Sequence, residues 1–108
     1  MITIKLDTTF TPYSKAVPVK PRHPLWYLKN TGTSGVVING VSYIPPRDGF
    51  GIDSLPILVP VIQEALKNNP GEKITIENNT QFSITFEDNG GTLTNQVMLI
   101  ETSINIVR

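Results

Sequence analysis

The sequence predicts a mainly β fold, a β-sandwich or jelly-roll-like barrel of about seven to nine strands with one short helix. Most of the chain consists of short stretches in which apolar and polar residues alternate, as they do in a strand with one buried face. Clusters of Gly, Pro, Asn and Asp separate these stretches, and a single segment has the period of a helix. A chain of 108 residues is large enough for one core, so we expect a single β-rich domain over residues 1–108.

The N-terminal region begins as a strand and then loses its alternation. Ile2, Ile4 and Leu6 share one parity, which predicts a short first strand with one buried face. Residues 8–24 contain four prolines, which remove backbone donors and favour extended or turned chain. One interpretation is a long surface loop, and the other is a proline-rich extended arm that lies against a neighbouring molecule. The partner-binding residues expected on such an arm are Phe10, Tyr13, Val17, Val19, Arg22 and His23.

Residues 25–30 resume the strand pattern, and both faces of this strand are apolar. Trp26 and Leu28 share one face, while Leu25 and Tyr27 share the other. Because a buried Trp is one of the largest contributions available to a core of this size, we expect a central strand or one that is covered on both sides.

Asn39-Gly40 predicts a tight hairpin, because a type I′ turn needs positive φ at both central positions and this pair tolerates it. A two-residue loop would place Ile38 opposite Val41 and Val36 opposite Tyr43. We therefore expect these four apolar residues to share one face, which another layer covers.

Residues 54–69 are the one helical candidate. Pro60 would clash inside a helix, so we place it at the first helical position, after an irregular turn over residues 55–59. The apolar stripe expected to face the sheet consists of Leu58, Val61, Ile62, Ala65 and Leu66.

The last third of the chain has the clearest strand pattern. Residues 74–76 and 82–86 alternate as strands, with turn-forming residues at 78–79 and at 88–91. From residue 96 onward the apolar parity predicts either one long bent strand or two strands with a break near residues 101–103. The residues of that parity are Met98, Ile100, Thr102, Ile104 and Ile106.

Composition excludes several classes of partner. Nine basic and nine acidic side chains balance, so no net field attracts nucleic acid or an anionic membrane, and repulsion between copies is weak. The chain has no cysteine, which excludes disulfides and thiolate metal sites. The first ten residues lack the regions of a signal peptide, and no run of about 18 apolar residues occurs. We expect a protein made in the cytoplasm that binds neither nucleic acid nor membrane.

The sequence contains no recognisable set of catalytic residues. His23 is the single histidine, and it lies between two prolines, with no second histidine or cysteine to share a metal. The Gly-x-Ser-x-Gly turn that presents a nucleophilic serine does not occur. We therefore expect a protein that is not an enzyme, with no catalytic site, no metal site and no cofactor.

Aromatic residues leave one different function open, that of a carbohydrate- or ligand-binding β-sandwich module. Trp26, Tyr27 and Tyr43 could supply rings on which a sugar stacks, in a chain that is rich in polar amides. This alternative predicts that Trp26 or Tyr43 is exposed in a groove, whereas a purely structural role predicts that Trp26 belongs to the core.

Residues 29–53 contain a recurring pattern: a strand ending in Asn-Thr-Gly, a short apolar strand, Asn-Gly, and a strand ending in a proline turn before an aromatic residue and Ile-Asp. The residues that form it are Asn30, Thr31, Gly32, Val36, Ile38, Asn39, Gly40, Tyr43, Pro45, Phe50, Ile52 and Asp53. The pattern resembles one found in small β-rich virion proteins of tailed and tailless bacteriophages. This resemblance implies a minor capsid, vertex, decoration or fibre-base subunit in the virion, which forms a homo-oligomer and docks on a major capsid protein.

Overall fold

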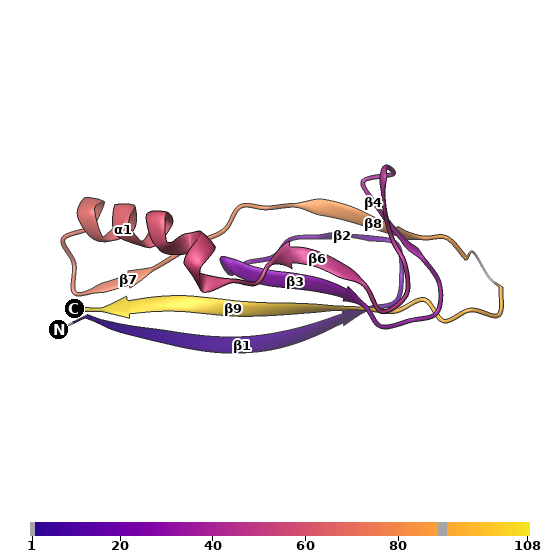
Figure 1. Cartoon of the computed structure of the whole chain (residues 1–108), viewed down its shortest axis with the longest axis horizontal. Coiled ribbons are helices and arrows are strands. Elements are labelled where there is room, and N and C mark those ends of the chain that lie inside the picture. Colours follow the sequence, from indigo (N-terminus) through magenta and orange to yellow (C-terminus); the bar gives the residue numbers. More distant parts are fainter. Residues whose placement is uncertain (1, 89–90) are drawn as a thin grey trace.

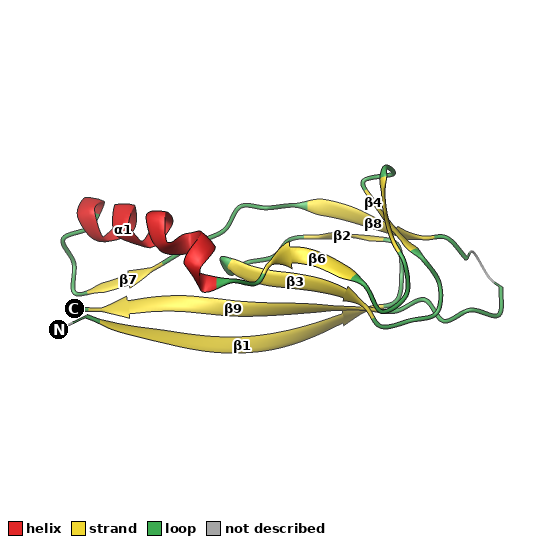
Figure 2. Ribbon diagram, viewed as in Figure 1, coloured by secondary structure: helices red, strands yellow, loops and turns green. Residues whose placement is uncertain are grey.

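A computed structural model describes residues 2–88 and 91–108, which form nine strands, a 3-10 turn and one α-helix. The predicted mainly β fold is confirmed, with the strands arranged in two antiparallel sheets as in a sandwich (Figure 2). Asn89 and Gly90, within the turn predicted at 88–91, lie outside the described residues. The elements are β1 (Thr3–Tyr13), β2 (Val17–Val19), β3 (Leu25–Asn30), β4 (Val36–Ile38), β5 (Ser42–Ile44), β6 (Gly49–Ile52), η1 (Leu55–Leu58), α1 (Val59–Asn68), β7 (Lys73–Thr75), β8 (Phe82–Phe86) and β9 (Val97–Val107).

The first sheet is built around β9. Its strand order is β1-β9-β3-β6, and β7 pairs with the C-terminal end of β9 beyond the end of β3. The second sheet has four strands in the order β2-β8-β4-β5. Every pairing in both sheets is antiparallel. The pairing of β1 with β9 joins the two ends of the described chain.

The molecule is elongated. Its extents are 54 × 22 × 20 Å and its radius of gyration is 16.3 Å, compared with about 13 Å for a compact domain of this length. Figure 1 shows the reason: the second sheet covers one end of β9 and α1 covers the other end. Two layers placed side by side along one long strand give two hydrophobic cores in place of one.

The first core lies between the two sheets. Trp26 of β3 packs against Phe50 of β6 and Phe82 of β8, with ring centroids 5.2 and 5.4 Å apart respectively. Trp26 is only 5% exposed. The prediction of a central strand over residues 25–30 is confirmed, because β3 lies between β9 and β6 and Trp26 and Leu28 both belong to this core.

The second core lies under the helix. Leu58 and Ile62 are buried against Ile74, Ile104 and Ile106, together with other residues of the same cluster. The predicted apolar stripe is confirmed for most of its members, and Pro60 lies in the first turn of α1, close to the expected position. Val61 is the exception, because it is 46% exposed.

Strand β9 changes its buried face partway along its length. Val97 and Leu99 contribute to the core between the sheets, whereas Ile104 and Ile106, of the opposite parity, contribute to the core under the helix. The register with β1 is continuous from Val107 to Val97, so β9 is one unbroken strand rather than two. Both covering layers lie on the same side of β9 in the view of Figure 1.

The hairpin after β4 has the predicted turn and a different register. Asn39 and Gly40 have φ of 52° and 73°, and the Val41 N–H donates to the Ile38 carbonyl, as a type I′ turn requires. However, Ile38 pairs with Ser42, so Val41 is an extra residue and the predicted pairing of Ile38 with Val41 is wrong by one position. The shift exchanges the two faces of β5. Ile44 is buried, whereas Val41 and Tyr43 are 84% and 55% exposed.

Candidate functional site

The most unusual surface of the molecule is the outer edge of the first sheet, which is formed by β1. This strand pairs with β9 over 11 residues without a bulge, and no described strand pairs with its other side (Figure 1). The N–H and C=O groups of alternate residues on that side have no strand to bond. Long flat edges of this kind are templates for pairing with another chain, and most proteins interrupt or cover them.

The face of β1 predicted to be buried is exposed. Ile2 is 53%, Ile4 42% and Leu6 49% exposed, and Phe10, which shares their parity, is 64% exposed. These four residues are called here the β1 stripe. The prediction of a buried face is therefore wrong for the isolated chain, because neither α1 nor the second sheet covers these four side chains. A run of exposed large apolar side chains on one face is typical of a surface that contacts another molecule.

The β1 stripe continues across the sheet. Phe10 lies directly opposite Ile100 of β9, and Ile100 lies opposite Tyr27 of β3. Ile100 and Tyr27 are half-buried. This row lies on the face of the first sheet that points away from the core shared with the second sheet, so the exposed apolar surface reaches inward from the edge.

The segment over residues 8–24 is not a free arm. Its first six residues belong to β1 and Val17–Val19 forms β2, the edge strand of the second sheet. Val19 is fully buried in the core between the sheets, and Tyr13 and Val17 pack against the same core. This corrects the prediction of an extended arm, and it removes Val19 from the surface that a partner could contact. Of the predicted apolar contacts, Phe10 alone is largely exposed.

Arg22 and His23 are held in place through their backbones. The Glu101 carboxylate, 7% exposed, accepts the Arg22 N–H at 2.5 Å and the His23 N–H at 3.4 Å. From the other side, the Asn78 amide donates to the carbonyls of Pro21 and His23 at 3.4 and 3.2 Å. This chain segment is therefore a fixed crossing between the two sheets. The Arg22 side chain is exposed and that of His23 is half-buried, and a partner-binding role for either stays a prediction.

The described residues contain no cluster of three His, Asp or Glu side chains that could hold a metal ion. Among the described helices, none has the length and apolar character needed to cross a membrane.

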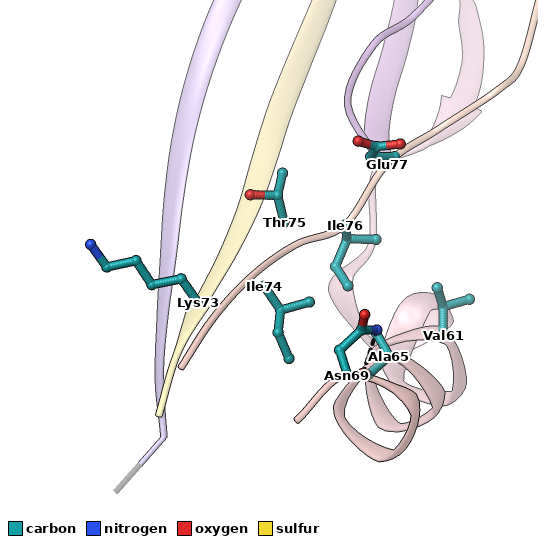
Figure 3. A pocket seen from close by; sticks show the side chains of 8 residues that line it. All are labelled: Val61, Ala65, Asn69, Lys73, Ile74, Thr75, Ile76 and Glu77. Carbon is teal, nitrogen blue, oxygen red and sulfur yellow. Dashed lines mark hydrogen bonds between the residues drawn. The ribbon is translucent and has the colours of Figure 1, made fainter. Parts of the chain in front are cut away.

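A groove lies between α1 and β7, with a volume of about 460 Å³. Figure 3 shows that Ile74 and Ile76 point toward the helix, whereas Lys73 and Thr75 point to the other side of the strand. The Asn69 amide donates to the Ala65 carbonyl of its own helix at 2.9 Å. Ile74 and Ile76 are almost completely buried, and the polar groups around them do not converge on a ligand as they do in a specific binding site.

The aromatic residues considered for sugar binding are distributed differently from what that alternative requires. Trp26 belongs to the core, and only Tyr43 is largely exposed. The Tyr43 hydroxyl donates to the Glu87 carboxylate at 3.3 Å, and its ring lies over Gly35, where any Cβ would collide with it. Partial desolvation and the negative charge of Glu87 raise the pKa of Tyr43 above its ordinary value.

One buried polar residue was not recognised as such from the sequence. Asn30 is 1% exposed, and its amide nitrogen donates to the carbonyls of Ser34 at 2.8 Å and Ile44 at 3.2 Å. Its amide oxygen accepts the Gly32 N–H at 3.1 Å. Asn30 therefore ties the end of β3 to the following loop and to β5. The Asn-Thr-Gly pattern around it has a structural explanation, which an alternation of apolar residues does not reveal.

Compared with models of known protein families, with curated proteins and with solved structures, the chain matches none of them.

Proposed function

We propose that this protein is a non-enzymatic structural subunit that works by self-association, in the manner of a minor capsid, vertex, decoration or fibre-base protein of a bacteriophage. The observation that carries the proposal is the β1 stripe: an 11-residue edge strand bearing Ile4, Leu6 and Phe10, with Ile2 just before it, each at least 42% exposed. Burying this apolar area against another molecule is favourable, at roughly 25 cal/mol for each Å² removed from water.

Charge and shape support the same proposal. The formal net charge is zero, so copies of the chain do not repel one another at long range. The molecule is elongated, with β1 running along one side of its long axis (Figure 1). A subunit of this form presents a long straight contact rather than a concave ligand site. The virion setting and docking on a major capsid protein come from the resemblance of residues 29–53 to small virion proteins.

A carbohydrate- or ligand-binding module is less well supported. It needs an exposed aromatic platform, and Trp26 is part of the core. Tyr43 is exposed, but its hydroxyl already bonds to Glu87 of the same chain.

Sedimentation equilibrium tests the proposal. The wild-type chain has a mass of 11.9 kDa, and we expect an oligomer whose mass is a multiple of this value. Replacing Ile4, Leu6 and Phe10 together with serine is expected to return the protein to 11.9 kDa. A matched control replaces three other exposed apolar residues, Val41, Ile57 and Leu93, and should leave the oligomer intact.

Two results would contradict the proposal. One is a wild-type protein that stays at 11.9 kDa up to millimolar concentration. The other is an oligomer that persists in the serine variant of the β1 stripe but dissociates in the control variant. The virion part of the proposal has its own test, because the protein should then sediment with virus particles made from the genome that encodes it.

A further inference from the structure

We propose that two copies of the chain pair antiparallel through their β1 strands in a single register, centred on Leu6, to form one continuous sheet of ten strands, five from each copy. This inference rests on the proposed function, and it names the partner and the contact: a second copy of this chain, joined edge to edge.

The edge itself favours such pairing. Strand β1 has no bulge over its 11 residues, and Pro12, which could block pairing, lies near its C-terminal end. Natural edge strands usually carry a lone lysine or an irregularity that prevents pairing with a copy of themselves. Strand β1 instead carries one cation and one anion, Lys5 and Asp7, two residues apart on one face and both exposed.

Symmetry restricts the possible registers. When two identical strands pair antiparallel about a twofold axis, the axis passes between a residue and its own copy, because opposite side chains must share a face. A register centred on Lys5 places two ammonium groups opposite each other, and one centred on Asp7 places two carboxylates opposite each other. Like charges in directly opposite positions destabilise a sheet.

The register centred on Leu6 is the one that matches charges. It sets Lys5 of each copy opposite Asp7 of the other, so the same cross-strand ion pair forms twice. A register centred on Thr8 leaves both charged side chains opposite threonine, and one centred on Ile4 places Lys5 opposite Thr3 and gives Asp7 no basic partner. Of the possible registers of the β1–β1 pairing, charge complementarity therefore favours the one centred on Leu6.

The same register also joins the two apolar stripes. Leu6 lies opposite its own copy, Ile4 opposite Thr8, and Ile2 opposite Phe10. Residues 2–10 of each copy, that is β1 from its start to Phe10 together with Ile2 before it, then form a ladder about 30 Å long. All the members of the β1 stripe acquire a cross-strand neighbour, which is the contact that stabilises antiparallel sheets.

Disulfide trapping tests the register. The chain has no cysteine, so a Leu6→Cys variant carries one thiol per copy. In the proposed register the two Leu6 Cα atoms are about 4.5–5.5 Å apart, which suits a disulfide. The matched control is Thr8→Cys, on the same exposed face, whose Cα atoms would be about 14 Å apart. We expect Leu6→Cys to form a covalent dimer at least ten times faster than Thr8→Cys under the same oxidant. Equal rates, or faster trapping at Thr8, would overturn the register.

Charge exchange tests it independently. In Lys5→Asp, two pairs of carboxylates face each other across the dimer, and in Asp7→Lys two pairs of ammonium groups do so. Each variant alone is expected to dimerise at least about tenfold more weakly than the wild type. An equimolar mixture of the two should form a heterodimer of wild-type strength, because every acidic side chain then faces a basic one. Failure of the mixture to recover would overturn the inference, provided that Trp26 emission shows both variants to be folded.

The outcomes separate this inference from the proposed function. A wild-type oligomer without trapping at Leu6 and without recovery in the mixture refutes the register alone, and self-association through another surface stands. A wild-type monomer at every concentration refutes both.

Discussion

Replacing Asn30 with alanine should weaken the fold strongly although the change removes only a small side chain. The substitution deletes two donated hydrogen bonds, to the Ser34 and Ile44 carbonyls, and one accepted from Gly32. The Gly32 N–H keeps a second acceptor, the Gln96 carbonyl at 3.0 Å. Two buried carbonyls therefore lose a partner, at about 1–3 kcal/mol each, and we expect a total loss of about 3 kcal/mol.

Urea denaturation followed by fluorescence is the assay, because the single tryptophan lies in the core between the two sheets. With an m-value of about 1.5 kcal/mol/M, a loss of about 3 kcal/mol lowers the midpoint by about 2 M. The control is Asn79→Ala, at an exposed position, where a change within about 0.5 kcal/mol is expected. If Asn30→Ala also stays within about 0.5 kcal/mol, the structural role assigned to this amide is wrong.

Two further predictions concern the other polar contacts. Glu101→Ala leaves the partly buried N–H groups of Arg22 and His23 without their acceptor and should destabilise the protein by about 2 kcal/mol in the same urea assay. A Glu101→Gln variant keeps an acceptor oxygen and should lose less than half as much; equal losses would contradict the stabilising role assigned to an acceptor at this position. The raised pKa of Tyr43 means that its contact with Glu87 is present when the hydroxyl is protonated and is lost as the pH rises through that raised value. Glu87→Gln removes the negative charge and should lower the pKa of Tyr43 toward its ordinary value in an NMR titration of the ring carbon next to the hydroxyl; an unchanged pKa would show that desolvation alone causes the shift.

The sequence was sufficient to predict those elements in which the apolar pattern alone indicates which side chains are buried. Strand β3 follows from the apolar character of both faces around Trp26, and helix α1 follows from its stripe and from Pro60 near its start. The turn at Asn39-Gly40 was also predictable, because its positive φ values depend only on those two residues. Its register was not, because Asn39 is bound to another strand: its backbone N–H donates to the Ser83 carbonyl at 2.8 Å, and its side-chain oxygen accepts the Ser83 N–H at 2.8 Å.

The proline-rich region shows why strand position matters as much as composition. Pro12 and Pro18 lie in β1 and β2, and both of these are edge strands. An edge strand tolerates proline because one side of it has no ladder to which an N–H must donate. From the sequence alone the prolines indicated a loop or a free arm, since nothing in the pattern reveals that a strand will lie at the edge of its sheet.

The candidate site was only partly predictable, for a related reason. Phe10 was expected to contact a partner, and it is the most exposed residue of the β1 stripe. Ile2, Ile4 and Leu6 were assigned to the core, because alternation identifies an apolar face without identifying what covers it. The exposure of that face in the structure suggests that a second molecule supplies the missing cover.

Amide hydrogen exchange of β1 at increasing protein concentration tests most directly whether this edge is an assembly surface. The account predicts that exchange of the outward-facing amides among residues 3–10 slows as the concentration rises through the range where the mass increases. Exchange in β5, the outer strand of the second sheet, should stay constant and serves as an internal control. Exchange in β1 that remains fast and unchanged while the protein oligomerises would contradict the account.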